Sequence, residues 1–341
     1  MSSLQAAVEA VAECVEDRYV QAAEGVRAAA ALREHLANGR YRAVPYDARL
    51  AEALTADLQE VLPDLHLQVR WSDAERTPSA VSDWDDPELR AAYWAREDLA
   101  NQGFDKAERL PGNVGFLAVR NVEEPEGTAQ VIDAAFAFLA RCNALVIDLR
   151  RTTGGAPSGV SHLLGHLLPP GTPLLQVVNR SGVVVENTAT PLGREPTLGP
   201  DVPVFVLVGR RTVSGCEELA YDLRAAGRAT LVGRTTLGAA NPVDVFAVDR
   251  HLVVRMPTAY VRNAVTGGNW EGVGITPDID CAVDDAPAVA HRLAAQSVRA
   301  RVEAGRLPHA EALVEELADV LAELDEELGD TGRGCPRVAW E

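Results

Sequence analysis

The stretch PVFVLVGRRTVSGCEELAYDL, residues 203–223, decides the fold and the place where a site is expected. Its first half is a continuous apolar run, typical of a strand buried on both faces of a sheet. Its second half has helical periodicity, so Ser214 and Gly215 lie where a strand gives way to a helix N-terminus. The free N–H groups and the positive dipole end of such a terminus stabilise a developing oxyanion. Ser214 is therefore a candidate nucleophile, and the alternative is that it only caps the helix, with Glu217 completing a capping box.

Strand and helix patterns alternate on both sides of this stretch. The predicted strands cover 114–122, 143–150, 174–179, 203–209 and 229–233, and the predicted helices cover 127–141, 158–167 and 215–226. Strands that alternate with helices pair in parallel through right-handed crossovers. We therefore expect an α/β core, followed by a hairpin over 243–262 with Asp249 and Arg250 near its turn.

Helical patterns lie before and after this core. The N-terminal pattern falls into three helices over 3–18, 20–37 and 46–62, and the last part of the chain is rich in Ala, Glu and Leu. A strand is predicted over 65–72 and a further helix over 85–102. The predicted domains are a helical bundle over 1–62, an α/β core over 63–283, and a C-terminal helical extension and tail over 284–341.

Charge and composition narrow the functional classes. A formal charge of −18 repels a phosphate backbone and no run of Lys or Arg offsets it, so nucleic acid is not an expected partner. No stretch has the ~20 apolar residues of a membrane-spanning helix, and the N-terminus is acidic and amphipathic rather than a leader. Five scattered cysteines without C-x-x-C spacing predict reduced thiols. We expect a soluble, cytoplasmic protein that contacts no membrane, unless a leader was removed.

Three other segments carry side chains or turns that a serine hydrolase needs. VIDLRRTTGGAP ends a buried strand in Gly154 and Gly155, which either approach a ligand closely or form a simple turn. GGNWEGVGITPDI places Glu271 in a Gly-rich loop, where a carboxylate either orients an imidazole or is a solvated charge. DLHLQV places His66 at the start of a strand, and a lone histidine is more often a packed or surface residue than a base.

The order of these segments and their residue motifs resemble those of the carboxyl-terminal-processing, or tail-specific, protease family. The likeness is greatest to the branch that contains the interphotoreceptor retinoid-binding protein repeats and the tricorn protease core, and it covers about residues 40–280. The matching motifs are Asp64-Leu65-His66, the D-L-R-x-x-x-G-G strand from Asp148 to Gly155, the T-x-S-x-x-E run from Thr212 to Glu217, the turn from Val232 to Gly238, and the N-W-E-G-V-G-x-x-P-D loop from Asn269 to Asp278. The resemblance implies an α/β fold with a crotonase/ClpP-like ββα-type core, an N-terminal helical bundle and C-terminal helices. It also implies serine hydrolase activity without a cofactor, with an oxyanion hole formed by Gly215 and by Gly154 or Gly155.

The family is divided by the base that activates its serine. Members with a peptide-binding PDZ domain use a Ser–Lys dyad, and the position that matches this lysine is Ala239. The only lysine of the chain, Lys106, is predicted to lie in a loop far upstream, so the residue types exclude a dyad. The tricorn-like branch uses a serine with a histidine and a glutamate. The matching catalytic residues here are Ser214, His66 and Glu271.

Departures from the family's motifs concern the surroundings of the site. The segment 67–112 is too short for a PDZ module, and the turn usually written G-E-T-T-G-G-G-A-H-P reads GRTTLGAANP from Gly233 to Pro242. We therefore expect a reshaped pocket, and we assign four residues to it: Cys216, Thr236, Asn241 and Trp270. Cys216 is interpreted as a buried small residue rather than a reactive thiol, although the helix N-terminus is expected to lower its pKa.

Two other motifs are considered and set aside. His162 and His166 stand at i and i+4 in HLLGH, a spacing that holds zinc on one helix face. No Glu follows His162 and no third ligand is evident in the sequence, so no metal site is predicted. The esterase elbow G-x-S-x-G is absent around Ser214, which disfavours an ordinary α/β-hydrolase.

The sequence thus predicts a serine hydrolase or peptidase that cleaves a peptide or a small amide or ester. His66 takes the Ser214 proton, Glu271 holds the imidazole, and water releases the acyl-enzyme. Two alternatives stay open: a non-catalytic module that binds an apolar ligand or a peptide, and a biosynthetic enzyme that uses the oxyanion hole for acyl transfer or cyclisation. The substrate and the oligomeric state, including a homo-oligomer, are left open by the sequence.

Overall fold

A six-stranded sheet forms the centre of the computed structural model, which describes residues 3–307 and 309–330. The strand order is β14-β10-β9-β5-β3-β2. These strands are β2 (Phe104–Leu110), β3 (Val114–Val119), β5 (Ala144–Asp148), β9 (Val204–Val208), β10 (Thr230–Gly233) and β14 (Ile279–Asp280). Five of them pair in parallel, and only β2 runs antiparallel, at the edge beside β3.

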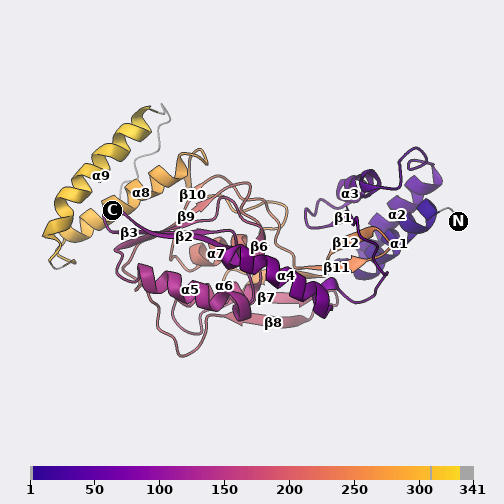
Figure 1. Ribbon diagram of the computed structural model, residues 1–341, viewed down its shortest axis with the longest axis horizontal. Coiled ribbons are helices and arrows are strands. Elements are labelled where there is room, and N and C mark those ends of the chain that lie inside the picture. The colour runs from indigo at the N-terminus through magenta and orange to yellow at the C-terminus, as the bar shows by residue number, and fades with distance from the viewer. Residues whose placement is uncertain (1–2, 308, 331–341) are drawn as a thin grey trace.

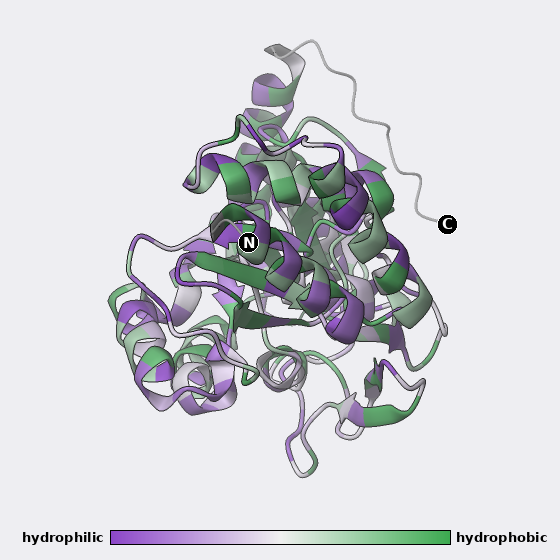
Figure 2. Ribbon diagram, turned by 90° about the vertical axis from the view of Figure 1, so that its right-hand side faces the viewer, coloured by the Kyte–Doolittle hydropathy of each residue, from purple (hydrophilic) through white to green (hydrophobic). Residues whose placement is uncertain are grey.

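Helices cover both faces of this sheet (Figure 1). They are α5 (Pro125–Leu139), α6 (Pro157–Leu164), α7 (Gly215–Ala225), α8 (Ala286–Glu303) and α9 (Glu311–Asp330). Because side chains alternate along a strand, Leu145 and Ile147 of β5 pack with α5, α6 and α7, whereas Ala144 and Val146 pack with α8 and α9. The central strands β5 and β9 are accordingly almost entirely apolar, with Asp148 at the end of β5 as the exception. Figure 2 shows green, hydrophobic strand segments inside the molecule.

Two smaller sheets lie beside the central one. The first has the order β13-β7-β8 and consists of β7 (Pro173–Asn179), β8 (Val184–Ala189) and β13 (Ala259–Asn263). The second is the parallel pair of β4 (Asn121–Val122) and β6 (Gly154–Gly155). The strand β4 leads directly into α5, and β6 leads into α6. The two glycines of interest are therefore held by a strand pair from which both of these helices depart.

The N-terminal helices form a third layer with a sheet of their own. They are α1 (Ser3–Arg18), α2 (Ala22–Ala37) and α3 (Ala48–Val61), and the sheet has the order β1-β12-β11, with β1 (Gln68–Trp71), β11 (Val243–Ala247) and β12 (Leu252–Pro257). Their shared hydrophobic core includes Phe246, Leu252, Val254 and Met256 from the hairpin. The helical bundle thus packs on a hairpin about 200 residues downstream of it. The predicted boundary between residues 62 and 63 separates these two segments, and the division into domains stays a prediction.

The α/β class with helices at both ends of the chain is confirmed, and three details of the prediction are wrong. Lys106 lies in strand β2, not in a loop; this edge strand is so polar that its pattern was not recognised. Strand β8 was not predicted either, since four of its six residues are exposed. Residues 259–263 leave the predicted hairpin and pair with β7.

The sequence also predicts a C-terminal tail and a helix over 85–102. The predicted tail over 331–341, with Cys335, lies outside the described residues. Helix α4 (Pro87–Leu99) begins as predicted with Pro87 in its first turn, because Asp86 caps the N–H groups of Glu88 and Leu89. None of the helices in the described part combines the length and the apolar character that crossing a bilayer requires.

Candidate active site

The turn between β9 and α7 carries Ser214 in a strained backbone conformation. Its φ of 55° and ψ of −126° lie outside the regions that a serine commonly adopts, and the residue is half-buried. An ordinary helix N-cap has an extended, negative φ, so capping alone does not require this geometry. Strain of this kind in a residue other than glycine is typical of functional sites, where the surrounding structure holds it in place.

Threonine hydroxyls fasten this turn to the segment that follows β5. The Thr212 hydroxyl donates to the Leu149 carbonyl over 2.7 Å, and the Thr152 hydroxyl accepts from the Val213 N–H over 3.0 Å. These bonds explain why the T-x-S run and the D-L-R-x-x-x-G-G strand, about 60 residues apart, meet in space. The Ser214 hydroxyl consequently lies beside Gly154.

The glycines beside Ser214 leave no room for side chains. A Cβ on Gly154 would lie 3.0 Å from the Ser214 Cβ and 3.4 Å from its Oγ, and the φ of Gly154 is 117°. A Cβ on Gly215 would lie 2.7 Å from the Gly155 carbonyl oxygen. The three predicted oxyanion residues Gly154, Gly155 and Gly215 therefore pack closely against one another beside the serine, at the N-terminus of α7.

Glu217 is the centre of a buried hydrogen-bond network behind Ser214. Its carboxylate accepts from the Ser214 N–H at 2.9 Å, from the Thr236 hydroxyl at 2.5 Å, and from the N–H groups of Gly238 and Ala239 at 2.7 and 3.0 Å. The side chain is completely buried, and this burial raises its pKa while the four donors lower it. The capping-box position of Glu217 thus holds the nucleophile turn against the loop over 236–239.

His66 is buried on the other side of this loop, next to Asp64. The Asp64 carboxylate accepts from the His66 N–H at 2.9 Å and from the Tyr19 hydroxyl at 3.1 Å. The Nδ1 atom of His66 is buried without a hydrogen-bond partner. Burial and the nearby Arg255 lower the pKa of the His66 imidazole to about 4, against the opposing charge of Asp64. The imidazole is therefore neutral at pH 7, the state that a general base requires.

Glu271 reaches this histidine from the Gly-rich loop. Acceptor or ligand-type atoms of Asp64, His66 and Glu271 all lie within 4.8 Å of one another. One oxygen of Glu271 accepts from the N–H groups of Ala240 and Asn241 at 2.7 and 2.9 Å, and the other is buried without a partner. Burial, and next the charge of Asp64, raise the pKa of Glu271 to about 7. Because Asp64 already accepts three hydrogen bonds, we interpret this group as an acid–base cluster rather than a metal centre.

The two halves of the site are connected through residues 239–241. The Ala239 N–H binds Glu217, the next two N–H groups bind Glu271, and the Asn241 side chain donates to Asp64 over 3.3 Å. The structure thus brings Ser214 together with the glycines, and His66 together with Glu271, around one short loop. Within the described residues, no hydrogen bond joins the Ser214 hydroxyl to the His66 imidazole. Catalytic hydrogen bonds are often absent or long before substrate binds.

The four residues assigned to a pocket are all buried: Cys216, Thr236, Asn241 and Trp270. Thr236 is engaged by Glu217, and Trp270 packs against Tyr221 with ring centroids 5.0 Å apart. The Cys216 thiol donates to the Gly154 carbonyl over 3.1 Å. The expectation of a lowered thiol pKa is wrong, because complete burial raises the pKa of Cys216 to about 12. Of the four, only Asn241 contacts the His66 cluster.

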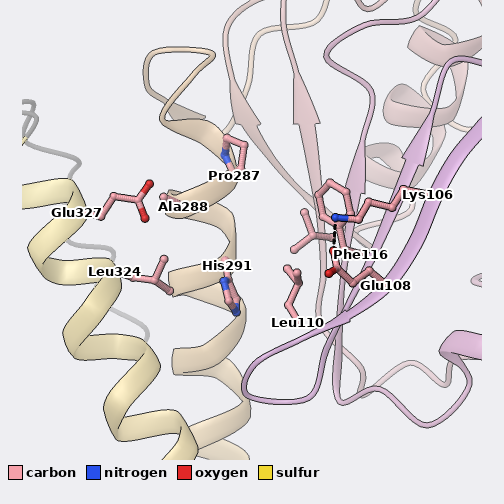
Figure 3. Close-up of a pocket in the computed structure, with 10 residues that line it drawn as sticks. Lys106, Glu108, Leu110, Phe116, Pro287, Ala288, His291, Leu324 and Glu327 are labelled. Carbon is pink, nitrogen blue, oxygen red and sulfur yellow. Dashed lines mark ion pairs between the residues drawn. The ribbon is translucent and has the colours of Figure 1, made fainter.

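Lys106 lies in a different part of the molecule from Ser214. It lines a cavity of about 260 Å³ between the edge of the central sheet and helices α8 and α9, together with Phe116 and His291 (Figure 3). Its ammonium group pairs with Glu108. Phe116 packs with the α8–α9 core, whereas α7, which begins at Ser214, packs with the core on the opposite face of the sheet. The exclusion of a Ser–Lys dyad therefore agrees with the position of this lysine.

Sequence patterns missed several residues around these side chains. Tyr19 at the end of α1 and Arg255 on β12 influence Asp64 and His66, but a tyrosine after a helix and an arginine in a hairpin carry no signal of that role. The sequence pattern of HLLGH also gave no sign of Asp133 of α5, which lies within hydrogen-bonding distance of both His162 and His166.

Comparison with protein families places the chain in a known group. A sequence model described as peptidase family S41 matches residues 113–281, which include the Ser214, Gly154 and Glu271 segments. A second model, described as the N-terminal domain of peptidase S41 in eukaryotic IRBP, matches residues 1–93. The chain belongs to peptidase family S41. The predicted membership in the tail-specific protease family, with an N-terminal region like that of the retinoid-binding protein, is confirmed.

Individual members of family S41 show more distant similarity. A carboxy-terminal-processing protease of Bartonella bacilliformis is 24% identical over 177 residues, covering 50% of this chain and 39% of that protein. The carboxy-terminal processing protease CtpB of Bacillus subtilis is 27% identical over 180 residues, covering 52% of this chain and 36% of that protein. The chain therefore spans little more than a third of the length of these two relatives.

A solved structure extends the similarity of the fold beyond the matched sequence. The photosystem II D1 C-terminal processing protease superimposes with a TM-score of 0.50 and 16% identity, covering 83% of this chain and 94% of that structure. At this identity the superposition supports the fold alone. The mixed α/β arrangement of this chain is thus that of an S41 peptidase.

Proposed function

We propose that this S41 family member is a serine peptidase that forms an acyl-enzyme through Ser214, His66 and Glu271. The observation that carries the proposal is the strained conformation of Ser214 at the N-terminus of α7, with its hydroxyl beside Gly154. A serine there is presented to a substrate, and the helix terminus and the glycine N–H groups favour negative charge on the attacked carbonyl. Membership in a peptidase family supports the same conclusion.

The chemistry follows from the protonation states of the two other groups. A neutral His66 accepts the Ser214 proton as the hydroxyl attacks the acyl carbon. The imidazolium that forms is stabilised by Glu271, whose second oxygen has no other partner. His66 then returns the proton to the leaving group, and a water molecule hydrolyses the acyl-enzyme.

The proposed substrate is a peptide, since two relatives are named carboxy-terminal processing proteases. We include a cytoplasmic location in the proposal, supported by the five scattered cysteines without C-x-x-C spacing, which predict reduced thiols. The segment 67–112 has no room for a PDZ module, so the proposed peptide contacts are with loops next to the site. The departures from Arg234 to Asn241 lie where such recognition is expected.

The proposal is tested by a fluorophosphonate probe followed by mass spectrometry of the intact, folded protein. We expect the probe to label Ser214 and no other serine, and Ser214→Ala to abolish peptide hydrolysis. The melting temperature should be nearly unchanged, because alanine keeps the Cβ of serine, so the strain of the turn stays the same and no clash is added. Labelling elsewhere, or full activity of the Ser214→Ala protein, would refute the nucleophile assignment.

A second candidate function is a binding module on the same fold. It is favoured by the absence, within the described residues, of a hydrogen bond between Ser214 and His66. In that case the folded protein binds a peptide or an apolar ligand but takes up no fluorophosphonate. Acyl transfer or cyclisation is distinguished from hydrolysis by its product, since only hydrolysis incorporates oxygen from ¹⁸O-labelled water.

A further inference from the structure

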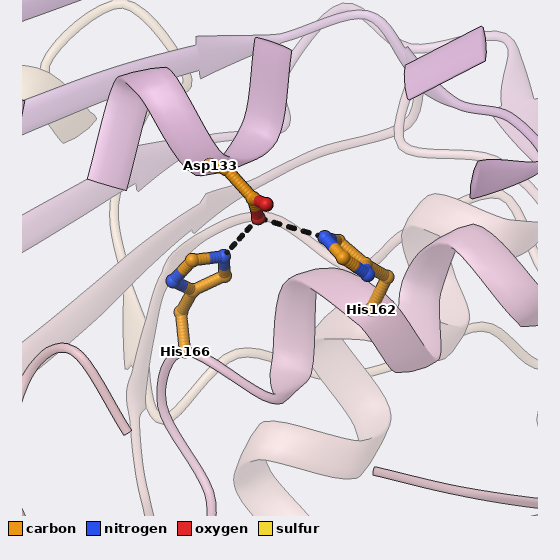
Figure 4. Close-up of side chains that lie close together, drawn as sticks. All are labelled: Asp133, His162 and His166. Atoms are coloured by element: carbon orange, nitrogen blue, oxygen red, sulfur yellow. Dashed lines mark hydrogen bonds and ion pairs between the residues drawn. The ribbon is translucent and has the colours of Figure 1, made fainter. Parts of the chain in front are cut away.

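Three side chains outside the candidate active site converge on one point of the α5–α6 face (Figure 4). Asp133 comes from the middle of α5, His162 from α6, and His166 from the turn that follows α6. The Nε2 atoms of His162 and His166 lie 2.8 and 3.0 Å from the same carboxylate oxygen, Oδ1 of Asp133. None of the three residues belongs to the relay proposed above.

The hydrogen bonds at this point conflict with one another. Nε2 of His162 faces the Asp133 oxygen, which needs a proton on that nitrogen, and it also faces Nη1 of Arg194 at 3.2 Å, which needs a lone pair there. Arg194 also donates through Nη2 to the same Asp133 oxygen at 2.8 Å. One tautomer of His162 therefore cannot satisfy both neighbours.

The second histidine is held from outside the cluster. Nδ1 of His166 lies 2.7 Å from the Thr197 hydroxyl, and its ring is stacked on Phe136 with centroids 4.2 Å apart. If the Thr197 oxygen accepts a hydrogen bond from the Nδ1–H of His166, the Nε2 lone pair of His166 points to Asp133. Metal-binding histidines are oriented in this way by a partner on their other nitrogen.

We propose that Asp133, His162 and His166 form a binding site for a divalent metal ion of the zinc class, which Arg194 occupies when no metal is bound. Two imidazoles and one carboxylate, with a water molecule as fourth ligand, are a donor set that suits zinc better than magnesium or calcium. The present spacings need to lengthen only slightly for three ligands around one tetrahedral ion. The guanidinium of Arg194 withdraws on binding, since a second cation has no place beside the metal.

The position of the site predicts a structural effect. Helix α5 follows β4 and helix α6 follows β6, and these two strands pair with each other through Asn121 and Gly154. A metal between Asp133 and His162 joins the two helices across that pair. Binding is therefore expected to raise the melting temperature of the whole chain, because an ion that binds only the folded state stabilises it.

The site is tested by titrating the whole, chelator-treated protein with Zn²⁺ by calorimetry and with Co²⁺ by visible absorption. We expect one ion per chain and a Co²⁺ spectrum of tetrahedral coordination. We expect each of three ligand variants to weaken metal binding by more than about 100-fold: Asp133→Asn, His162→Gln and His166→Gln. The loss of a residue that only orients a ligand, such as Thr197, weakens metal binding by about 10- to 100-fold. His291→Gln is the matched control, because this partly exposed histidine lies on α8, which packs on the opposite face of the sheet from α5 and α6.

Arg194→Gln separates a metal site from a network of ion pairs. Removal of the competing cation should tighten Zn²⁺ binding by at least about tenfold, since a unit charge at this distance opposes a metal ion by several RT. The proposal is overturned if the Arg194→Gln variant binds Zn²⁺ and the natural chain does not. It is also overturned if the natural chain binds Zn²⁺ with an affinity that none of the three ligand variants lowers. His162→Gln decides the matter if the more deeply buried His166 is needed for folding, which circular dichroism checks.

Discussion

Two glutamates, the buried Glu217 and the half-buried Glu271, accept hydrogen bonds from neighbouring segments of one loop but differ in how many of their oxygens have partners. The carboxylate of Glu217 accepts four hydrogen bonds and is fully buried. That of Glu271 accepts two on one oxygen, and its other oxygen has no partner. His66, beside Glu271, likewise has an unpartnered buried nitrogen.

This difference separates the scaffold of the site from its working groups. A satisfied buried network makes a part of the structure rigid, whereas an unpartnered buried polar atom costs free energy, and a catalytic role explains why that cost is kept. Ser214 is therefore positioned by Glu217, and proton transfer is left to His66 and Glu271. Substitutions on the two sides should accordingly have opposite effects on stability and on catalysis.

Replacement of His66 should give the largest effect. His66→Gln removes the base, and we expect kcat for peptide hydrolysis to fall by about 10⁴-fold or more, as for the loss of a triad histidine in other serine hydrolases. The stability of the fold should change little, since the buried Nδ1 atom has no partner to lose. Steady-state kinetics and thermal denaturation measure the two effects.

His35→Gln is the control for this variant. His35 on α2 lies 3.2 Å from Asp57, in the helical bundle, and a change there should leave kcat within about twofold, as expected for substitutions remote from the chemistry. An active His66→Gln protein would show that another group takes the serine's proton, and the division into scaffold and working groups would fail with it.

The two glutamates test the comparison directly. Glu217→Gln turns an acceptor of four hydrogen bonds into an amide that must present donors to some of them, and we expect the free energy of unfolding to fall by about 3 kcal/mol. Glu271→Gln should leave the stability unchanged or higher at pH 7, while kcat falls by about 10³- to 10⁴-fold because the imidazolium loses its carboxylate. Urea denaturation and kinetics on both variants give the answer.

The reverse pattern would contradict the assignment. If Glu271→Gln unfolds the protein and Glu217→Gln keeps its stability, then Glu271 is the structural residue. Glu217→Asp is a useful third variant, since it keeps the charge but shortens the reach to Gly238 and Ala239, and it should fall between the natural protein and Glu217→Gln in stability.

Local patterns sufficed to predict the central elements of the fold. Strand β9 is uniformly apolar, and β5 is apolar up to Asp148 at its end, because helices cover both of their faces; this property is visible in consecutive residues. The transition from strand to helix at Ser214 is equally local. The edge strand β2, in contrast, is polar, and only its pairing with β3 makes it a strand.

The site could be predicted only where motifs mark it. Ser214, His66 and Glu271 stand in recognisable segments, but no residue pattern indicates that Tyr19 binds Asp64, 45 positions away. Asp133 was missed for the same reason: its helix has an ordinary amphipathic pattern, and only the packing of α5 on α6 brings it to the two histidines. Contacts between distant segments depend on tertiary packing, which a periodicity does not encode.

The pH dependence of stability should reveal the two working groups. The pKa of Glu271 is raised from 4.5 to about 7 in the folded protein, so its contribution to stability is lost as pH rises through this range. The pKa of His66 is lowered from 6.5 to about 4, so its contribution is lost as pH falls through that range. Each shift corresponds to at most about 3 kcal/mol.

Variants isolate these contributions. The stability of Glu271→Gln relative to the natural protein should increase between pH 4.5 and 7, and that of His66→Gln should increase between pH 6.5 and 4. Chemical denaturation at five or six pH values measures both differences. If stability against pH runs parallel in the variants and the natural protein, folding does not shift the pKa of Glu271 or of His66. The protonation states proposed for the two groups would then be wrong.

The smallest effect is expected at Cys216, and it tests whether the scaffold half of the site stays closed. The thiol is completely buried, donates to the Gly154 carbonyl, and has a pKa raised to about 12. It should therefore resist iodoacetamide at pH 8 in the folded protein and react in urea, as seen by mass spectrometry of the same peptide. Cys216→Ala should cost only about 1 kcal/mol of stability and leave kcat within a few fold. Rapid alkylation of the folded protein would mean that the contact between Gly154 and α7 opens often. Ser214 would then not be held rigidly in the position from which its proton passes to His66, and the assignment of a rigid scaffold would be wrong.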